Sequence, residues 1–351
     1  MPAEWHPHQA TWLAFPHNRE TWPTQLNAVR ETFLRMMLQL LPGERVELLV
    51  ADQETADAVG QQLDERGADV RKLTCRIIPT ADAWIRDYGP NFLLQDPSRS
   101  PAALSDCPPL AFNDWTFNAW GGKYLDLARD NRIASMLAPA LEARRFVPGL
   151  ALEGGAIEVN GEGLCLTTEQ CLLNPNRNPG LSPQEIEEVL CACLGVKRIV
   201  WLGQGLEGDD TDGHIDDIAR FVDPRTVVCL REEDSSDANY PLLEENWKRL
   251  QAARDLSGRP LRLVPLPSPG RIEADGERLP TSYANFYIAN QVVLVPTFAH
   301  CNDELALGTL RQLFPGRQVI GLDCRDLVCG LGAIHCATQQ QPAPNSRVLT
   351  G

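Results

Sequence analysis

The chain has 351 residues, of which 43% are hydrophobic and 23% are charged, so it can bury a substantial core. Its formal net charge of −15 repels phosphate backbones and anionic lipid, which argues against nucleic acid and membranes as partners. The same charge would attract a small cationic molecule.

The N-terminal residues MPAEWHPHQATWLAF lack the basic start and unbroken apolar run of an export signal. No segment offers the roughly 20 apolar residues that a membrane span needs. The eleven cysteines are odd in number and include no C-x-x-C pair, so neither a disulfide framework nor a zinc site is indicated. We therefore expect a cytoplasmic protein whose cysteines are mostly buried apolar residues.

The first predicted elements are helices at residues 27–41 and 52–67, which flank the strand RVELLVA. A unit of two strands, a helix and a further strand then recurs along the chain, and a faint copy of it fits residues 83–148. The proline-rich stretch from Pro97 to Pro109 is interpreted as a surface excursion between strands.

The clearest copy of the unit starts at Leu152, with two strands around the turn Asn160-Gly161. Ser182 and Glu185 form a predicted capping box around Pro183, and Gly195 ends the helix that follows. The apolar face of this helix consists of Ile186, Val189, Leu190, Cys193 and Leu194. The strand RIVWL completes the unit.

Two more copies follow. One has the strands HIDDIARFVD and TVVCLRE, a helix with Leu243, Trp247 and Leu250, and the strand PLRLVPL. The last has the strands YANFYIAN and QVVLVPTF, a helix, and the strand QVIGLD. The predicted apolar face of this last helix contains Leu305, Thr309, Leu310 and Leu313.

Five similar units cannot each bury a face alone, so we expect them to share one core. This predicts an α/β fold closed into a pseudo-fivefold assembly, a five-bladed propeller of ββαβ units, with residues 1–351 as one catalytic domain. The alternative is a doubly wound sheet. That fold is associated with a glycine-rich phosphate loop, and no G-x-G-x-x-G occurs at a strand-to-helix turn.

Four segments place rare polar groups beside glycine at the starts or ends of different units, where a propeller would bring them together. They are Trp84–Pro90, Leu152–Gly155, Thr211–Asp216 and Gly330–Cys336. Glycine at such places allows the backbone to approach a ligand closely. The segments therefore mark the candidate site.

His214 and Asp216 are two residues apart, so on a strand both side chains would face one cavity. This pair suits acid–base catalysis or metal binding, and a structural His–Asp pair is an equal alternative. His335 and Cys336 would face opposite sides of a strand, which predicts an orienting or packing role for the histidine.

Asp87 would alternate with Arg86 on a strand in the same way, and a structural pair of the two is the competing interpretation. Glu153 is either functional or a buried hydrogen-bond anchor. Cys336 alone would be interpreted as structural, and only its neighbours in the four segments suggest a nucleophile. Carboxylates near a thiol raise its pKa and favour a neutral Cys336 in the free site, whereas a bound cation or a protonated His214 would offset this effect. The resting ionisation of Cys336 and His214 stays open at this level.

Together these segments resemble the agmatine deiminase family, within the guanidine-modifying superfamily that includes arginine and peptidylarginine deiminases. The resemblance runs from PAEWHPH to IHCATQQQP and includes FNAWGGKY and LLNPNRNP. It implies the same five-bladed α/β propeller. Two departures occur: Leu331 interrupts three consecutive glycines, and Ala333 stands where relatives often have Asn.

The resemblance implies that Cys336 is the nucleophile, His214 the general acid–base, and Asp87 and Asp216 the carboxylates that bind the guanidinium. It also implies that Glu153 orients the histidine. The substrate-binding positions that it suggests, besides these two aspartates, are Trp84, Trp120 and Gly332.

The implied reaction converts agmatine to N-carbamoylputrescine and ammonia through a covalent thiouronium, and it requires no metal or organic cofactor. Free arginine would call for a cationic residue to meet its carboxylate, and no motif arginine is assigned to that task. Peptidylarginine, amidino transfer to an amine, and assembly into two or four copies stay open. Two further alternatives are an iron oxygenase that uses His214, Asp216 and His300, and a binding protein without catalysis.

Overall fold

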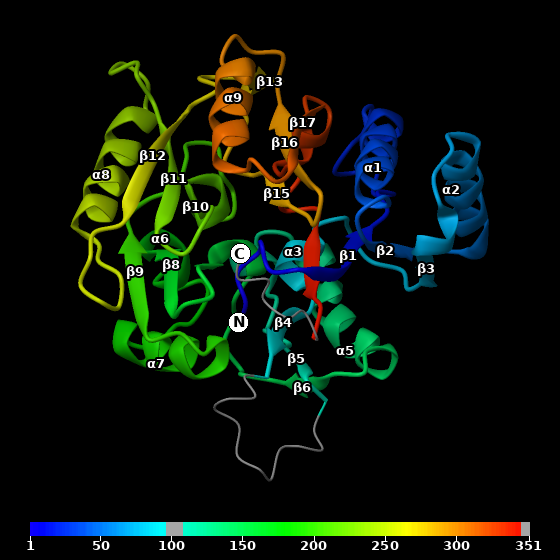
Figure 1. The fold of residues 1–351 in the computed structure, drawn as a ribbon, viewed down its shortest axis with the longest axis horizontal. Helices are drawn as coiled ribbons and strands as arrows, with labels where there is room; N and C mark the ends of the chain where they lie inside the picture. The colour runs from blue at the N-terminus through cyan, green and yellow to red at the C-terminus, as the bar shows by residue number, and fades with distance from the viewer. Residues whose placement is uncertain (96–107, 345–351) are drawn as a thin grey trace.

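The computed structural model describes residues 1–95 and 108–344. Within these residues the main strands form five separate sheets of three or four strands, and α1, α5, α7, α8 and α9 lie around the outside of the molecule (Figure 1). In four of the sheets, an antiparallel pair is followed by a parallel pair whose connection contains a helix. A parallel pair requires such a crossover, so the ββαβ order of the sequence determines this local topology.

These four sheets follow one another along the chain. The second unit contains β4 (Asn91–Leu94), β5 (Leu110–Asn113), α5 (Ile133–Leu137) and β6 (Arg144–Phe146). The third contains β7 (Glu158–Val159), β8 (Leu164–Thr168), α7 (Pro183–Leu194) and β9 (Arg198–Leu202). The fourth contains β10 (Ala219–Phe221), β11 (Thr226–Arg231), α8 (Asn239–Ala252) and β12 (Arg262–Pro267). The fifth contains β15 (Tyr287–Ile288), β16 (Val292–Thr297), α9 (Asp303–Leu313) and β17 (Gln318–Asp323).

The first unit closes the ring because one edge strand of its sheet, the one nearest the centre of the molecule, comes from the other end of the chain (Figure 1). Strand β18 (Gln339–Pro342) pairs antiparallel with β1 (His8–Ala14), with Trp12 opposite Gln339. The rest of the unit consists of α1 (Leu26–Leu40), β2 (Arg45–Val50), α2 (Gln53–Glu65) and β3 (Leu73–Ile77). Cys336 lies three residues before β18, so the N-terminal unit helps to fix its position.

Short elements fill the connections. They are α3 (Ile85–Tyr88), α4 (Ala119–Gly122), α6 (Glu169–Leu172), the ribbon of β13 (Glu273–Ala274) and β14 (Glu277–Arg278), and the 3-10 helices Val70–Lys72, Leu125–Arg132, Ala138–Ala140, Gly154–Ala156, Ile215–Asp217 and Leu327–Gly330. Several of them carry candidate site residues.

Helix α7 forms as predicted, because both bonds of the Ser182–Glu185 capping box are present and Gly195 adopts a left-handed conformation at φ +68°. The predicted face of α9 is wrong in part. Leu305 is 60% exposed, and the buried residues are Ala306, Leu307 and Leu310. The sheet therefore contacts a face about one residue further around the helix than the leucine spacing suggested.

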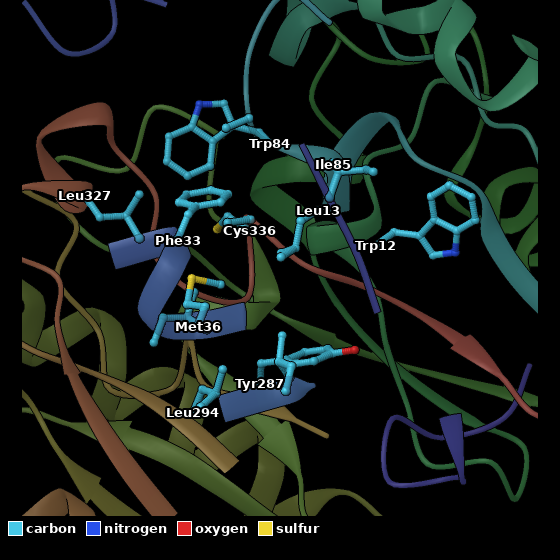
Figure 2. Close-up of a cluster of buried hydrophobic side chains, with 14 of the residues drawn as sticks. Trp12, Leu13, Phe33, Met36, Trp84, Ile85, Tyr287, Leu294, Leu327 and Cys336 are labelled. Carbon is cyan, nitrogen blue, oxygen red and sulfur yellow. The ribbon is translucent and has the colours of Figure 1, made fainter. Parts of the chain in front are cut away.

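The largest buried cluster joins the N-terminal unit to the fifth unit and to the candidate site. Figure 2 shows Phe33 of α1 and Tyr287 of β15 in this cluster, together with Trp84 and Cys336. Apolar packing thus holds the segment that carries the sulfur against the N-terminal unit.

The five repeated units confirm the predicted α/β propeller, and the doubly wound alternative is wrong because the strands lie in separate sheets. Most of the stretch from Pro97 to Pro109 lies outside the described residues. No helix in residues 1–95 or 108–344 combines the length and apolar character needed to cross a bilayer.

Candidate active site

A cavity of about 410 Å³ opens beside Cys336. Trp84, Trp120 and Asp87 line it together with the cysteine. Among the described residues, its other acidic lining groups are Glu20, Asp82, Asp126 and Asp210, and its one basic lining group is Lys123. Lys123 is itself paired, with its ammonium 2.7 Å from Asp212 Oδ1. The cavity therefore suits a cation.

Asp87 lies on the single helical turn α3, whereas a strand was predicted. The turn closes because Gly89 N donates to Ile85 O at 2.8 Å. Asp87 is 5% exposed; its Oδ1 accepts from Gly155 N at 3.0 Å and its Oδ2 from Trp120 Nε1 at 2.9 Å. These two donors hold the carboxylate in place. Each of its oxygens can still accept a further hydrogen bond from a ligand.

The predicted strand at His214 and Asp216 is also wrong, because these residues begin and lie within the 3-10 helix Ile215–Asp217 and β10 starts only at Ala219. The two side chains nevertheless meet at Gly155. A Cβ built on this glycine would lie 2.5 Å from His214 Nδ1, 2.9 Å from Asp87 Oδ1 and 3.1 Å from Asp216 Oδ2. Only glycine fits where these three groups converge.

Cys336 lies in a turn, in place of the predicted strand, since Ala337 N donates to Ala333 O at 3.2 Å. Its sulfur is 3.9 Å from Asp216 Oδ2 and 3.2 Å from the donor Asn285 Nδ2. His335 contacts the same oxygen, Asp216 Oδ2, through Nδ1 at 2.6 Å. This contact agrees with the orienting role that was expected of His335.

Glu153 lies behind His214. Its Oε1 accepts from Arg177 Nε at 2.7 Å, and its Oε2 is 3.8 Å from His214 Nε2. Cys171 Sγ is 3.9 Å from the same Oε2. His214 is fully buried, and neither of its ring nitrogens has a hydrogen-bond partner among the described residues. Both ring nitrogens therefore lack a hydrogen bond from the described protein residues, although the ring lies close to Asp87 and Glu153.

Of the further positions that were predicted to bind substrate, Trp84 and Trp120 line the cavity, and Gly332 lies against Trp84. Trp120 has φ +52°, a strained conformation for a non-glycine residue, and this conformation accompanies its bond to Asp87. A Cβ on Gly332 would lie 2.6 Å from Trp84 Cζ3, so the glycine lets the indole pack closely. Leu331 lines the cavity at φ +65°, a left-handed conformation that favours glycine.

Three contacts of the site were missed at the sequence level. Arg177 lies in LLNPNRNP, which contributed to the resemblance without a role, and the structure pairs it with Glu153. Asn285 was assigned to a strand, and its position inside an apolar segment was the only available signal. Cys171 was interpreted as a small apolar residue, and it lies beside His214 and Glu153.

Charge and burial set the protonation of the two central groups. Burial and the carboxylates of Asp216, Asp217 and Asp87 raise the pKa of the Cys336 thiol well above its usual range. Burial alone would lower the pKa of His214, but Asp87, Cys171 and Glu153 together raise it well above its usual range. Both pKa directions favour a protonated thiol at Cys336 and a protonated imidazole at His214 in the free site, a question that the sequence left open.

Alkylation tests this resting state. We expect iodoacetamide to modify Cys336 slowly at pH 7, where a thiol of raised pKa is less than about 1% thiolate, and faster as the pH rises. Mass spectrometry of the Cys336 peptide measures the rate. A rate that is already maximal at pH 7 would contradict the assignment, and the exposed Cys301 provides an internal reference.

Metal binding fits this site poorly. Among the described residues, Glu153, Cys171 and His214 form a group whose donor atoms lie within 4.8 Å of one another. Arg177 already supplies a buried cation to Glu153. His300 lies beside Asn302 and Asp303 at the start of α9, and it is not part of that group. The geometry therefore gives no support to the oxygenase alternative.

Comparison with known proteins gives a consistent result. A family described as Porphyromonas-type peptidyl-arginine deiminase matches residues 1–342. A relative from Legionella pneumophila (strain Paris) is 42% identical over 97% of this chain and 95% of its own. The agmatine deiminase of Ectopseudomonas mendocina (strain ymp) is 36% identical over 98% of this chain and 95% of its own. The solved structure of the agmatine deiminase of Enterococcus faecalis superposes with a TM-score of 0.87 at 32% identity, covering 97% of this chain and 95% of that one.

Proposed function

The chain belongs to the Porphyromonas-type peptidyl-arginine deiminase family, and from this premise we propose that it hydrolyses agmatine to N-carbamoylputrescine and ammonia. The convergence of Asp87, Asp216 and His214 near the sulfur of Cys336, at one end of an acidic cavity, carries this proposal. A flat cation bound between the carboxylates would place its central carbon beside the sulfur.

The charge of the cavity supports agmatine over arginine. Agmatine carries a guanidinium and an amine, and the cavity offers acidic groups beyond Asp87 for the second cation. The carboxylate of arginine would instead face these acidic groups. Lys123 is engaged by Asp212, so it offers arginine little compensation.

Substrate binding orients the guanidinium relative to the sulfur of Cys336. Asp87 and Asp216 accept N–H bonds from the guanidinium, which fixes its plane and supplies the buried Oδ1 of Asp216 with the partner that it lacks among the described residues. The substrate cation also offsets the carboxylates that keep Cys336 neutral, so the thiol ionises more readily once substrate is bound. Sulfur placed about 3 to 3.5 Å from the central carbon then attacks it.

Proton transfer completes both half-reactions. Sulfur bonds to carbon, His214 donates a proton to the leaving nitrogen, and the C–N bond breaks; the proton that the thiol loses leaves with the ammonia as ammonium. His214 then takes a proton from water, and the hydroxide adds to the same carbon. The C–S bond breaks as the urea C=O forms, and the proton of the added hydroxyl passes to the sulfur, so the thiol and the imidazolium are both restored. In this scheme Glu153, held by Arg177, keeps the imidazole in place.

A panel of agmatine, free arginine, blocked arginine peptides and short guanidino acids tests the substrate. We expect agmatine to give the highest kcat/KM, measured from ammonia release together with the ureido product. Preference for a carboxylate-bearing compound would overturn the substrate while leaving the chemistry. An amidino transferase would form the same thiouronium, but it would release little ammonia and would modify an added amine.

We further infer one catalytic domain that works in the cytoplasm. The closure of the ring by β1 and β18 supports the single domain, because both ends of the chain contribute to one sheet. The ten cysteines among the described residues are all free, which fits a reducing compartment.

A further inference from the structure

Glu4, near the N-terminus, lies directly beneath the candidate site. Its side chain is buried, and its Oε2 is 2.8 Å from His335 Nε2. Its Oε1 accepts from Ile288 N at 2.8 Å and pairs with Arg220 Nη2 at 2.9 Å. The N-terminal segment therefore reaches the residue next to the nucleophile.

His335 lies between two carboxylates, with Nδ1 2.6 Å from Asp216 Oδ2 and Nε2 2.8 Å from Glu4 Oε2. An ionised carboxylate only accepts hydrogen bonds, so both ring nitrogens must carry a proton. Burial opposes ionisation of Glu4, but Arg220, His335 and Arg86 hold its pKa well below its usual range. Burial likewise opposes ionisation of Asp216, whose pKa is lowered chiefly by His335. His335 therefore joins these two carboxylates through its two ring nitrogens.

We propose that Glu4 and His335 are positioning residues, which hold Asp216 in the orientation that presents its free Oδ1 to the guanidinium. We call this arrangement the Glu4–His335–Asp216 bridge. It rests on the proposed function, because it assumes that Asp216 binds the substrate. The buried Oδ1 of Asp216 has no partner among the described residues, which is the state expected of an oxygen that waits for a ligand.

The surrounding charges favour this state of His335. Arg86 contacts Glu4 and donates to the backbone oxygen of His335 at 3.3 Å, and Arg220 lies between Glu4 and Glu158. The three carboxylates of Glu4, Glu158 and Asp216 against these two guanidiniums leave one negative charge, and the extra proton of His335 neutralises it. Asp217 and Cys336 complete the titratable surroundings, and both contact Asn285.

Two measurements test the bridge. In wild-type protein labelled with 15N-histidine, both ring nitrogens of His335 should carry a proton, as their two carboxylate partners require. The signal is assigned by its loss in His335→Gln. In Glu4→Gln the Nε2 proton loses its carboxylate partner and its signal should shift, and KM for the preferred guanidino substrate should rise about tenfold while kcat changes less. Glu4→Asp should restore part of the affinity.

Glu47→Gln provides the matched control. Glu47 is a buried carboxylate on β2 that pairs with Arg76 at 2.7 Å and does not line the cavity beside Cys336. Equal KM changes in Glu4→Gln and Glu47→Gln, or a His335 with a proton on only one ring nitrogen in the wild type, would overturn the proposal. The NMR measurement on the wild type needs no substrate, and a variant serves only to assign the signal. A doubly protonated His335 without agmatine turnover would therefore contradict only the proposed substrate.

Discussion

Cys336→Ser should lower turnover of the preferred guanidino substrate by at least about 10⁴-fold while leaving substrate binding largely intact. A serine hydroxyl is a far weaker nucleophile than a thiol, and the carboxylates around it oppose its ionisation even more strongly than that of the thiol. The groups that bind the cation, Asp87 and Asp216, are unchanged. Ammonia release measures the rate, and calorimetry with the same compound measures binding.

Cys229→Ser is a control that distinguishes loss of the nucleophile from the loss of stability caused by burying a hydroxyl. Cys229 is a fully buried cysteine on β11, away from the cavity lining. This control should lose about 1 to 3 kcal/mol of unfolding free energy and keep its turnover. If Cys336→Ser retains a tenth of the wild-type rate, residue 336 is not the nucleophile. If both variants lose turnover equally, the loss reflects stability.

The fold was largely predictable because each repeated unit is specified by residues close together in the sequence. Each ββαβ unit can be recognised from its own residues, by alternation in its strands, a capped helix and a turn, as in the unit that begins at Leu152. The closure of the ring was not predictable in this way. Strand β18 pairs with β1 across more than 320 residues of sequence, and nothing in QQQP indicates a partner so far away.

The site was predictable in its residues but not in its backbone. Glycine beside isolated polar groups marked all four segments, and the resemblance supplied the roles. Alternation along a strand was the wrong geometry for three of them, because Asp87, His214 and Cys336 all lie on short turns. Such turns are closed by contacts to other units, so a period of two in a short segment cannot identify them.

The charged residues buried behind the site were even harder to identify from the sequence. Glu4 and Arg177 are charged residues in segments that contributed only to the resemblance, and their function-related contacts appear only when distant units meet. The ion pairs that surround them explain how a site with several buried carboxylates stays folded. Arg86, Arg177 and Arg220 each pair with a buried acid, and none of these pairs uses Asp87 or Asp216, the carboxylates that we propose bind the substrate.

His214→Gln should lower kcat by about 10³-fold with a smaller change in KM, because the variant loses the proton donor and acceptor but not the binding carboxylates. The sign of the pH dependence follows from the pKa of His214, which is raised well above its usual range. In the wild type the imidazolium is present at neutral pH, so kcat should fall on the alkaline side as the proton is lost. The glutamine variant should lack this alkaline fall.

His8→Gln is the matched control for this change. His8 is also buried and pairs with a glutamate, at 3.2 Å from Glu44 Oε1, but it lies on β1 outside the cavity lining. Its replacement should cost stability without changing the pH profile of kcat. A His214→Gln enzyme that keeps kcat within tenfold of wild type, with the alkaline fall intact, would assign the proton transfer to another group. The neighbouring carboxylic acid of Asp87, whose pKa burial raises, would then be the candidate because it lies on the same cavity.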